Sequence, residues 1–406
     1  VYNFGGHGIV SNQDVLELKL FKSDPERYHL ESDHHQLIEN NNNYRRFNQN
    51  QYTNQNSSNP PKSRERRSSG RLSDATNIND SYSDFSRNTG PNDPNRIGYH
   101  IDQKLAKWGG GVFNQERAND KNFTTDFLVT RALNILQEDK NKPFCLMLSI
   151  PDPHGPDQVR APYNTMYTHF KFEEPRTMHT PEGLKDPLWV KKGKKNTAKS
   201  IKQHNMAQYY GMVKCIDDNV GRLLDFLDQN NLTQNTIVVF TSDHGDLLGE
   251  HGKINKGLPY ETSARVAFMM RYPKKIKPGK YIEKAYTMAD FTPTILGLMG
   301  IKTSKEFHGM NAAKDFKSSK KQLINERTVY LTNANKRWVS AVNNQYKLVM
   351  SPLDKPWLFD LKNDPDELVN FYNNPNYSAI AKSLKKELYV QMGLYNEPLE
   401  ISDLMK

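Results

Sequence analysis

The sequence lacks any long apolar run and contains very little cysteine. No stretch of eighteen apolar residues occurs in its 406 residues, so no transmembrane helix is expected. The opening at Val1 lacks the basic-then-apolar pattern of a signal peptide. Cys145 and Cys215 are too few for a disulfide framework and have no metal-like spacing. Both are expected to be buried, Cys145 on a strand and Cys215 on a helix.

The chain is basic, with a formal net charge of +10. Such a balance attracts anions, including nucleic acids, acidic lipids and sulfated or phosphorylated substrates. The excess is spread along the chain, so a solvated lysine-rich surface explains it equally well. The length allows one large α/β domain and a smaller one.

Residues 39–98 are rich in Asn, Gln, Ser, Arg and Pro. Because such a segment cannot bury enough apolar surface to offset the entropy of ordering it, we expect a partly disordered insertion that a protease would cut first. Its basic part, residues 62–71, could instead contact RNA, with Tyr44 and Tyr52 stacking on bases. No nucleic-acid-binding fold surrounds it, so no nucleic-acid partner is expected.

After residue 99, helical patterns alternate with short apolar runs. The expected helices are residues 123–139, 204–230 and 290–298, and the expected buried strands are residues 144–150, 236–241 and 264–271. The long helix would place Met212, Val213 and Ile216 on one apolar face. This alternation predicts a mainly parallel sheet covered by helices. Beyond residue 312, an antiparallel meander is expected at residues 328–331, 337–342, 346–350 and 357–360, followed by a helix at 377–393.

The strand expected at residues 236–241 ends in Ser242-Asp243-His244-Gly245-Asp246. Ligands of open α/β sheets bind beyond the carboxyl ends of the strands. Asp243 and His244 are therefore placed to bind a metal, and Gly245 would let the chain turn sharply. The alternative is an Asp that only caps the next turn.

Several further blocks follow the same order as in one known family. They are Leu248-Gly249-Glu250-His251-Gly252, Lys256, Tyr260-Glu261, Ser263-Ala264-Arg265-Val266, Pro151-Asp152-Pro153-His154-Gly155-Pro156, Ala289–Leu296, Phe307–Met310 and Trp357–Glu367. Over roughly residues 99–397 the sequence resembles the sulfatase family of the alkaline phosphatase superfamily. The resemblance implies an α/β fold, with a mainly parallel sheet sandwiched by helices and a small C-terminal antiparallel α+β subdomain.

The same resemblance implies a division of the chain. Residues 1–38 would be a remnant of the N-terminal part of the sulfatase domain, and residues 39–98 the insertion. Residues 99–315 would form the C-terminal part of the catalytic domain, and residues 316–406 the α+β subdomain.

The resemblance also implies roles for four residues. Asp243 and His244 would bind a divalent cation, usually Ca²⁺ in this family. Lys256 would contact a non-bridging sulfate oxygen. His154 would bind the ester and help to protonate the leaving alcohol. The alternatives are a surface lysine at 256 and a histidine that fixes its loop at 154.

Three neighbouring features carry weaker signals. His251 is expected to be structural, or to support the site without catalysing. Arg160 is six residues beyond the histidine of the 151–156 loop and is expected to be a loop arginine with no role in binding an anion. Asp217 and Asp218 lie inside the long helix, so a solvated helix face is expected there.

The sequence departs from the family at the nucleophile. Sulfatases use a formylglycine made from Cys or Ser in a Cys/Ser-x-Pro/Ala-x-Arg motif, and neither Cys145 nor Cys215 begins one. The early Asp-Asp metal pair of the family is also missing. We therefore expect that this chain lacks an N-terminal segment of its parent protein and that it is inactive alone. The parent would need a formylglycine-generating enzyme as a partner.

The resulting prediction is a hydrolase of a sulfate ester, on a small molecule or a glycan, that acts by a metal-assisted covalent mechanism. One rival is a phosphodiesterase or phosphonate hydrolase of the same superfamily. Another is a catalytically inactive homologue that binds anionic glycans. Family analogy suggests a secreted, periplasmic or lysosomal protein, and the sequon Asn122-Phe123-Thr124 is compatible with a secretory route.

Overall fold

The computed structural model describes residues 118–121, 123–155, 157–182, 184–191, 200–319, 322–324, 326–333 and 337–401. The remnant expected at residues 1–38 and the insertion expected at residues 39–98 lie outside this part. Two compact units are present, a helical unit of residues 118–172 and 202–232, and a sheet-containing unit of residues 173–201 and 233–401. None of the described helices is long and apolar enough to cross a membrane.

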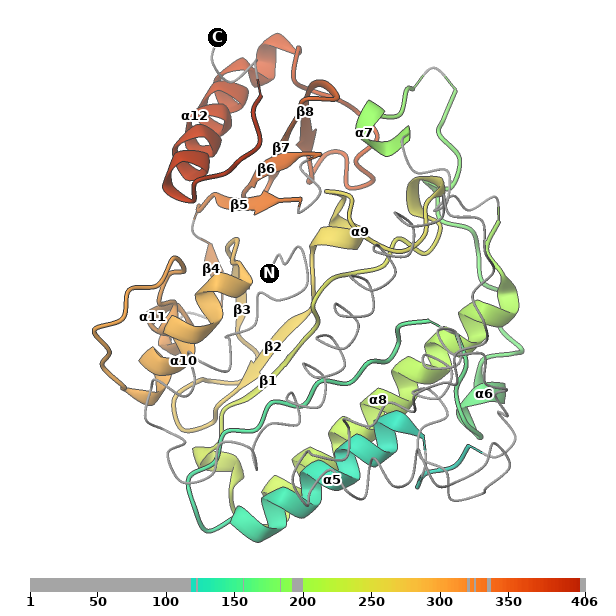
Figure 1. The fold of residues 1–406 in the computed structure, drawn as a ribbon, viewed down its shortest axis with the longest axis vertical. Helices are drawn as coiled ribbons and strands as arrows, with labels where there is room; N and C mark the ends of the chain where they lie inside the picture. The colour runs from blue at the N-terminus through green and yellow to red at the C-terminus, as the bar shows by residue number, and fades with distance from the viewer. Residues whose placement is uncertain are drawn as a thin grey trace, which may run out of the picture. The chain divides into compact units, whose positions relative to one another are not determined.

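The helical unit is built on two helices that lie side by side (Figure 1). Helix α5 (Thr124–Asp139) packs along α8 (Gln203–Gln229), and the short α6 (Tyr163–Met166) lies against α8. Both long helices occur where the apolar period predicted them. Met212 and Cys215 are fully buried on the inner face of α8, as expected for Cys215.

Three expectations for this unit are wrong. Residues 144–150 form no strand in the described part of the chain, although Leu146 and Leu148 pack on the helices. Without a paired neighbour this segment is only partly covered, and Cys145 is exposed instead of buried. Val213 is 40% exposed, because the buried positions of α8 follow a narrower stripe, three and four residues apart, that excludes it.

The sheet-containing unit begins with a two-stranded antiparallel pair. Strand β1 (Val238–Thr241) pairs with β2 (Phe268–Arg271), and the short helix α9 (Glu261–Ala264) directly precedes the second strand. Both strands lie within the expected ranges. They are half-buried, and Phe240 is 38% exposed, because each has a single partner strand in the described residues. The full burial expected from the sequence is therefore not observed.

A parallel pair follows. Strand β3 (Tyr281–Glu283) pairs with β4 (Gln322–Ile324), and the connection between them contains α10 (Phe291–Met299) and α11 (Ala313–Lys317). Helix α10 ends at Gly300, whose φ of 78° is the left-handed conformation that glycine adopts without strain. Shorter helices are α7 (Leu188–Lys191), η4 (Thr233–Asn235), η5 (Glu250–Gly252), η6 (Met288–Asp290) and η7 (Pro375–Tyr377).

The C-terminal part is a four-stranded antiparallel meander with one helix on it. Its strands are β5 (Val329–Thr332), β6 (Val339–Val342), β7 (Tyr346–Ser351) and β8 (Asp354–Asp360), paired in chain order, and its helix is α12 (Ser378–Leu394). All five elements match the sequence prediction closely. Figure 1 shows α12 lying along this sheet, in agreement with its contacts to β6 and β7.

Both faces of the meander are covered. Leu348 and Leu358 face α12 and pack on its Leu384 and Leu388. The side chains that alternate with them, including Val349, Trp357 and Phe359, form a second core with Trp189 and Tyr260. Since Tyr260 belongs to the segment that follows β1, this second face joins the meander to the residues singled out by the sequence.

Candidate functional site

Asp243 and His244 lie just beyond the end of β1, where the sequence predicted them. The Asp243 carboxylate accepts the backbone N–H of His244 at 2.9 Å, and its Oδ2 lies 3.3 Å from His244 Nε2. His244 Nδ1 lies 2.8 Å from the carbonyl oxygen of Gly245. Because a carbonyl oxygen can only accept, Nδ1 carries a hydrogen, and Nε2 is the ring nitrogen that faces the carboxylate. A carboxylate oxygen and an imidazole nitrogen are both groups that bind metal ions in proteins.

The pair fits only part of a metal site. The Asp243 side chain is 58% exposed, and the backbone carbonyl that fixes the ring of His244 resembles the outer partner of a metal-binding histidine. Ca²⁺ takes about six to eight oxygen ligands. The described residues contain no group of three or more His, Cys, Asp or Glu that could hold a metal. The metal role of the pair stays a prediction, and further ligands would be required.

Gly245 holds the pair against the start of α9. Its N–H donates to the Ser263 carbonyl at 3.0 Å, and a Cβ added at this position would lie 2.0 Å from the carbonyl oxygen of Thr262. Only glycine permits this approach. The glycine expected to allow a turn therefore also permits close backbone packing.

The segment from Asp246 to Asn255 forms a tight loop that ends next to Lys256. Asp246 Oδ1 accepts the backbone N–H groups of Leu248 at 3.1 Å and Asn255 at 3.0 Å. Lys256 is half-buried, and no other described residue makes a hydrogen bond or ion pair with its amine. Contact of this amine with sulfate stays a prediction.

His251 lies on the tip of this loop and packs flat on a buried tyrosine. The rings of His251 and Tyr260 have centroids 3.5 Å apart and planes 7° from parallel. Burial, with a smaller contribution from the charge of Lys347, lowers the pKa of His251 from 6.5 to about 3. A histidine that stays neutral and stacked at physiological pH agrees with the structural role expected for it.

His154 belongs to the helical unit, on a loop that α5 braces. Asp152 accepts a hydrogen bond from the Thr125 hydroxyl, and the His154 N–H donates to the Pro151 carbonyl at 3.1 Å. His154 is exposed, and its Nδ1 lies 2.8 Å from the Gly155 carbonyl. Because Asp243 and Lys256 belong to the other unit, convergence of His154 with them stays a prediction.

Two other charged features of the helical unit are structural. Arg160 donates two hydrogen bonds of 2.7 Å to the buried Asp126, so its guanidinium is already paired. Asp218 accepts from Lys214 and from the Tyr163 hydroxyl on the surface of α8. These contacts are those expected of a loop arginine and a polar helix face, and the absence of a role in the site stays a prediction.

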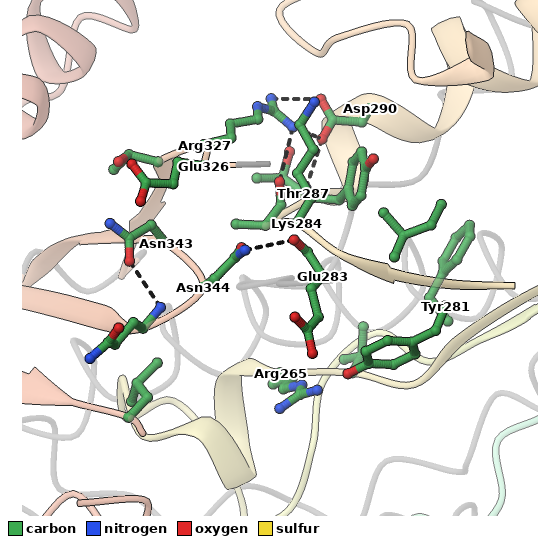
Figure 2. A pocket seen from close by; sticks show the side chains of 18 of the residues that line it. Arg265, Tyr281, Glu283, Lys284, Thr287, Asp290, Glu326, Arg327, Asn343 and Asn344 are labelled. Carbon is green, nitrogen blue, oxygen red and sulfur yellow. Dashed lines mark hydrogen bonds and ion pairs between the residues drawn. The ribbon is translucent and has the colours of Figure 1, made fainter. Parts of the chain in front are cut away.

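A separate hollow lies in the sheet-containing unit between β3, α10 and the meander (Figure 2). Arg327 forms a two-pronged ion pair with Asp290, at 2.6 and 3.0 Å. Asn344 donates to the Glu283 carbonyl at 2.6 Å. These contacts join neighbouring segments of the wall and stabilise the hollow.

Comparison with known proteins identifies the family. The sulfatase family model matches residues 20–301. The chain belongs to the sulfatase family. A second model, described as the C-terminal part of N-sulphoglucosamine sulphohydrolase, matches residues 249–392. This match covers the β5–β8 meander and α12, so the sulfatase resemblance extends through the C-terminal subdomain.

Curated sulfatases are similar over part of their length. An arylsulfatase of Clostridium perfringens is 30% identical over 299 residues, which cover 66% of this chain and 57% of that protein. An N-acetylglucosamine-6-O-sulfatase of Bacteroides thetaiotaomicron is 26% identical over 356 residues, covering 69% and 64%. The chain thus spans more than half, but less than two thirds, of these sulfatases.

Solved structures confirm the predicted fold class. A protein solved with its substrate D-glucosamine-2-N,6-O-disulfate has a TM-score of 0.58 at 23% identity, covering 68% of this chain and 70% of its own. A phosphonate monoester hydrolase of Agrobacterium radiobacter has a TM-score of 0.58 at 18% identity, covering 76% and 75%. The sulfatase chain therefore has the alkaline phosphatase-like α/β fold with an antiparallel C-terminal subdomain.

The sequence analysis did not predict one buried cluster of charged side chains. Lys347 on β7 is fully buried between the carboxylates of Glu261 and Glu367. Both glutamates lie in blocks that carried the sulfatase resemblance, but nothing in those blocks points to a lysine partner. Lys347 is followed by the apolar run Leu348-Val349-Met350, which predicts a strand covered on both faces but does not identify the carboxylates that would pair with a buried lysine.

Proposed function

We propose that the parent protein hydrolyses a sulfate ester carried by a sugar, with a divalent cation and a formylglycine nucleophile. The observation that carries the proposal is the sequence of groups after β1, in a chain that matches the sulfatase model. Asp243 and His244 present a carboxylate oxygen and an imidazole nitrogen 3.3 Å apart, and Lys256 offers a positive charge at the end of the same loop.

Each group would have a distinct task. Asp243 and His244 would hold part of the coordination of Ca²⁺ or another divalent cation, which would supply Lewis-acid stabilisation of sulfate charge. Lys256 would neutralise charge on a non-bridging oxygen as the bond to sulfur changes. His154 would deliver a proton to the leaving alcohol.

The nucleophile must come from elsewhere in the parent. The 406 residues contain no Cys/Ser-x-Pro/Ala-x-Arg motif from which formylglycine could be made. The proposal therefore includes an upstream segment that carries this motif, and a formylglycine-generating enzyme that modifies it. The names of two relatives, an N-acetylglucosamine-6-O-sulfatase and an endo-4-O-sulfatase of Bacteroides thetaiotaomicron, support a sulfated sugar as the substrate.

The test is a turnover assay of the parent protein, co-expressed with a formylglycine-generating enzyme. The substrates would be an aryl sulfate, a 6-O-sulfated N-acetylglucosamine and an aryl phosphonate monoester. Hydrolysis of a sulfate ester that a chelator abolishes, and that Asp243→Ala also abolishes, supports the proposal. Turnover of the phosphonate alone would replace it with a phosphonate hydrolase. Sugar binding without any turnover would indicate an inactive glycan-binding homologue.

A further inference from the structure

Lys347 is a cation held in the core by three oxygen partners. Its Nζ lies 2.6 Å from Glu261 Oε1 and 2.8 Å from Glu367 Oε1, and donates to the Pro259 carbonyl at 2.8 Å. Its side chain has no exposed surface. Removing an ammonium group from water costs several kcal/mol, and only close partners such as these offset that cost.

These partners belong to the short segment that follows Lys256. The Glu261 N–H donates to Glu367 Oε2 at 2.6 Å. At the other end, the Gly257 carbonyl accepts from Asn333 Nδ2 at 3.1 Å and from Trp338 Nε1 at 3.3 Å. Residues 257–261, which we term the anchor segment, are thus held at both ends by groups of the C-terminal meander and the loop after it.

The anchor segment also reaches the chain before Lys256. Tyr260 is 2% exposed and stacks on His251, the residue at the tip of the preceding loop. Lys256 therefore lies between two points, His251 and Gly257, that are each fixed through contacts leading to the meander. Ordering the backbone of one residue costs about 1–2 kcal/mol of entropy, so a backbone at Lys256 that is already fixed spares anion binding that cost.

We propose that Lys347 is a positioning residue that holds the backbone on which Lys256 meets the sulfate group. The proposal rests on the proposed function for the role of Lys256. Lys347 touches no substrate and acts through the anchor segment. Without its charge, the buried Glu367 would lose its counterion, and Glu261 would keep only Arg265, whose guanidinium lies 4.0 Å away. Glu367 would then have to take up a proton or draw in water. The anchor segment would then loosen and release Lys256.

The experiment compares the wild-type chain with Lys347→Met, Lys347→Arg and Asn333→Ala. Lys355→Met is the matched control, because Lys355 is an exposed lysine on the neighbouring strand β8. Amide hydrogen exchange reports local opening of residues 246–261, and calorimetric titration with inorganic sulfate reports anion binding. Lys347→Met should speed exchange in this region and weaken sulfate binding by about tenfold each, with α12 unaffected.

Lys347→Arg should recover part of both losses because it retains the charge, and Lys355→Met should match wild type. Asn333→Ala removes one anchor contact without breaking the ion cluster, so it should shift both readouts in the same direction even if Lys347→Met does not fold. Unchanged exchange in residues 246–261 of both variants would overturn the inference.

Lys256→Ala distinguishes an error in the positioning role of Lys347 from an error in the sulfate-binding role of Lys256. If Lys256→Ala abolishes sulfate binding while Lys347→Met and Asn333→Ala leave it intact, the positioning role is wrong and the proposed function stands. If Lys256→Ala binds sulfate as tightly as wild type, the role proposed for Lys256 itself is wrong. In that case, the positioning proposal fails with it, whatever the exchange data show.

Discussion

The imidazole of His251 lies parallel to the ring of Tyr260, with centroids 3.5 Å apart. This contact keeps the ring neutral, because burial lowers the pKa of His251 from 6.5 to about 3. A folded-state pKa below the unfolded value gives stability that is present above pH 6.5 and is lost as the pH falls towards 3.

The first prediction follows from that shift. The free energy of unfolding of the wild-type chain should fall between pH 6.5 and 3 more steeply than that of His251→Asn, by up to about 1.4 kcal/mol per pH unit. Asn tolerates the left-handed backbone of this position, whose φ is 52°. Denaturant titrations of both proteins at several pH values provide the measurement. Parallel pH profiles would contradict the assigned pKa.

The second prediction concerns the ion pair of Arg327 and Asp290 in Figure 2. Arg327→Met leaves the Asp290 carboxylate, which is 3% exposed, without its cation, and should lower the free energy of unfolding by about 3–5 kcal/mol. Arg176→Met is the control, because Arg176 pairs with Asp366 while its own side chain is 80% exposed. The control should cost less than about 1 kcal/mol. Equal losses in denaturant titration would show that burial of the first pair is unimportant.

The third prediction uses two glycines. Gly245→Ala should lower the free energy of unfolding by about 1–3 kcal/mol, because its methyl group would meet the Thr262 carbonyl at 2.0 Å. Gly221→Ala lies inside α8 with nothing within 4 Å of the added methyl group, and should stabilise by about 0.5–1 kcal/mol. Thermal unfolding of both variants gives the comparison. An unchanged free energy of unfolding for Gly245→Ala would show that the backbone at residue 245 does not lie this close to the Thr262 carbonyl.

The fourth prediction concerns Lys256 in the active parent protein. Lys256→Ala should reduce kcat/KM for a sulfate ester by about two to three powers of ten, as expected for loss of a group that stabilises developing negative charge. The exposed Lys355 supplies the matched variant, Lys355→Ala, which should retain full activity. Steady-state kinetics on an aryl sulfate measure kcat/KM for both variants. A loss below about threefold, well short of a charge-stabilising group, would remove Lys256 from the proposed mechanism.

The fifth prediction concerns the 406-residue chain alone. It should show little or no turnover of an aryl sulfate, because electrostatic help from Lys256 cannot replace a covalent nucleophile. Asp243 and His244 also provide too few ligands to hold a cation tightly. The assay is run with and without a chelator, beside the parent protein. Robust hydrolysis that a chelator does not affect would show that the proposed mechanism is wrong.

The sequence predicted those elements that depend on local pattern. Helices α5 and α8 and the whole β5–β8 meander fall within a few residues of their expected ranges, because their apolar spacing and turns identify them. Residues 144–150 were misread as a strand, since a short apolar run becomes a strand only when a neighbour pairs with it. For the same reason Cys145 is exposed.

The candidate site was predictable in part. The Ser-Asp-His-Gly block located Asp243 and His244 at the end of β1, where they lie. The ion cluster around Lys347 was not predictable, because its members come from α9, β7 and the segment after β8, and their meeting depends on tertiary packing. The apolar run after Lys347 predicts a covered strand but not which carboxylates meet the lysine.

The parallel pairing of β3 with β4 has a consequence for the order of folding. These strands can meet only after the chain from Glu283 to Gln322, with α10 and α11, has folded back on itself, whereas the antiparallel strands of the meander are joined by short connections. Closing the longer loop costs more chain entropy before any contact compensates for it. When the complete chain refolds, the C-terminal meander is therefore expected to act as an early nucleus, and the β3–β4 crossover to form later.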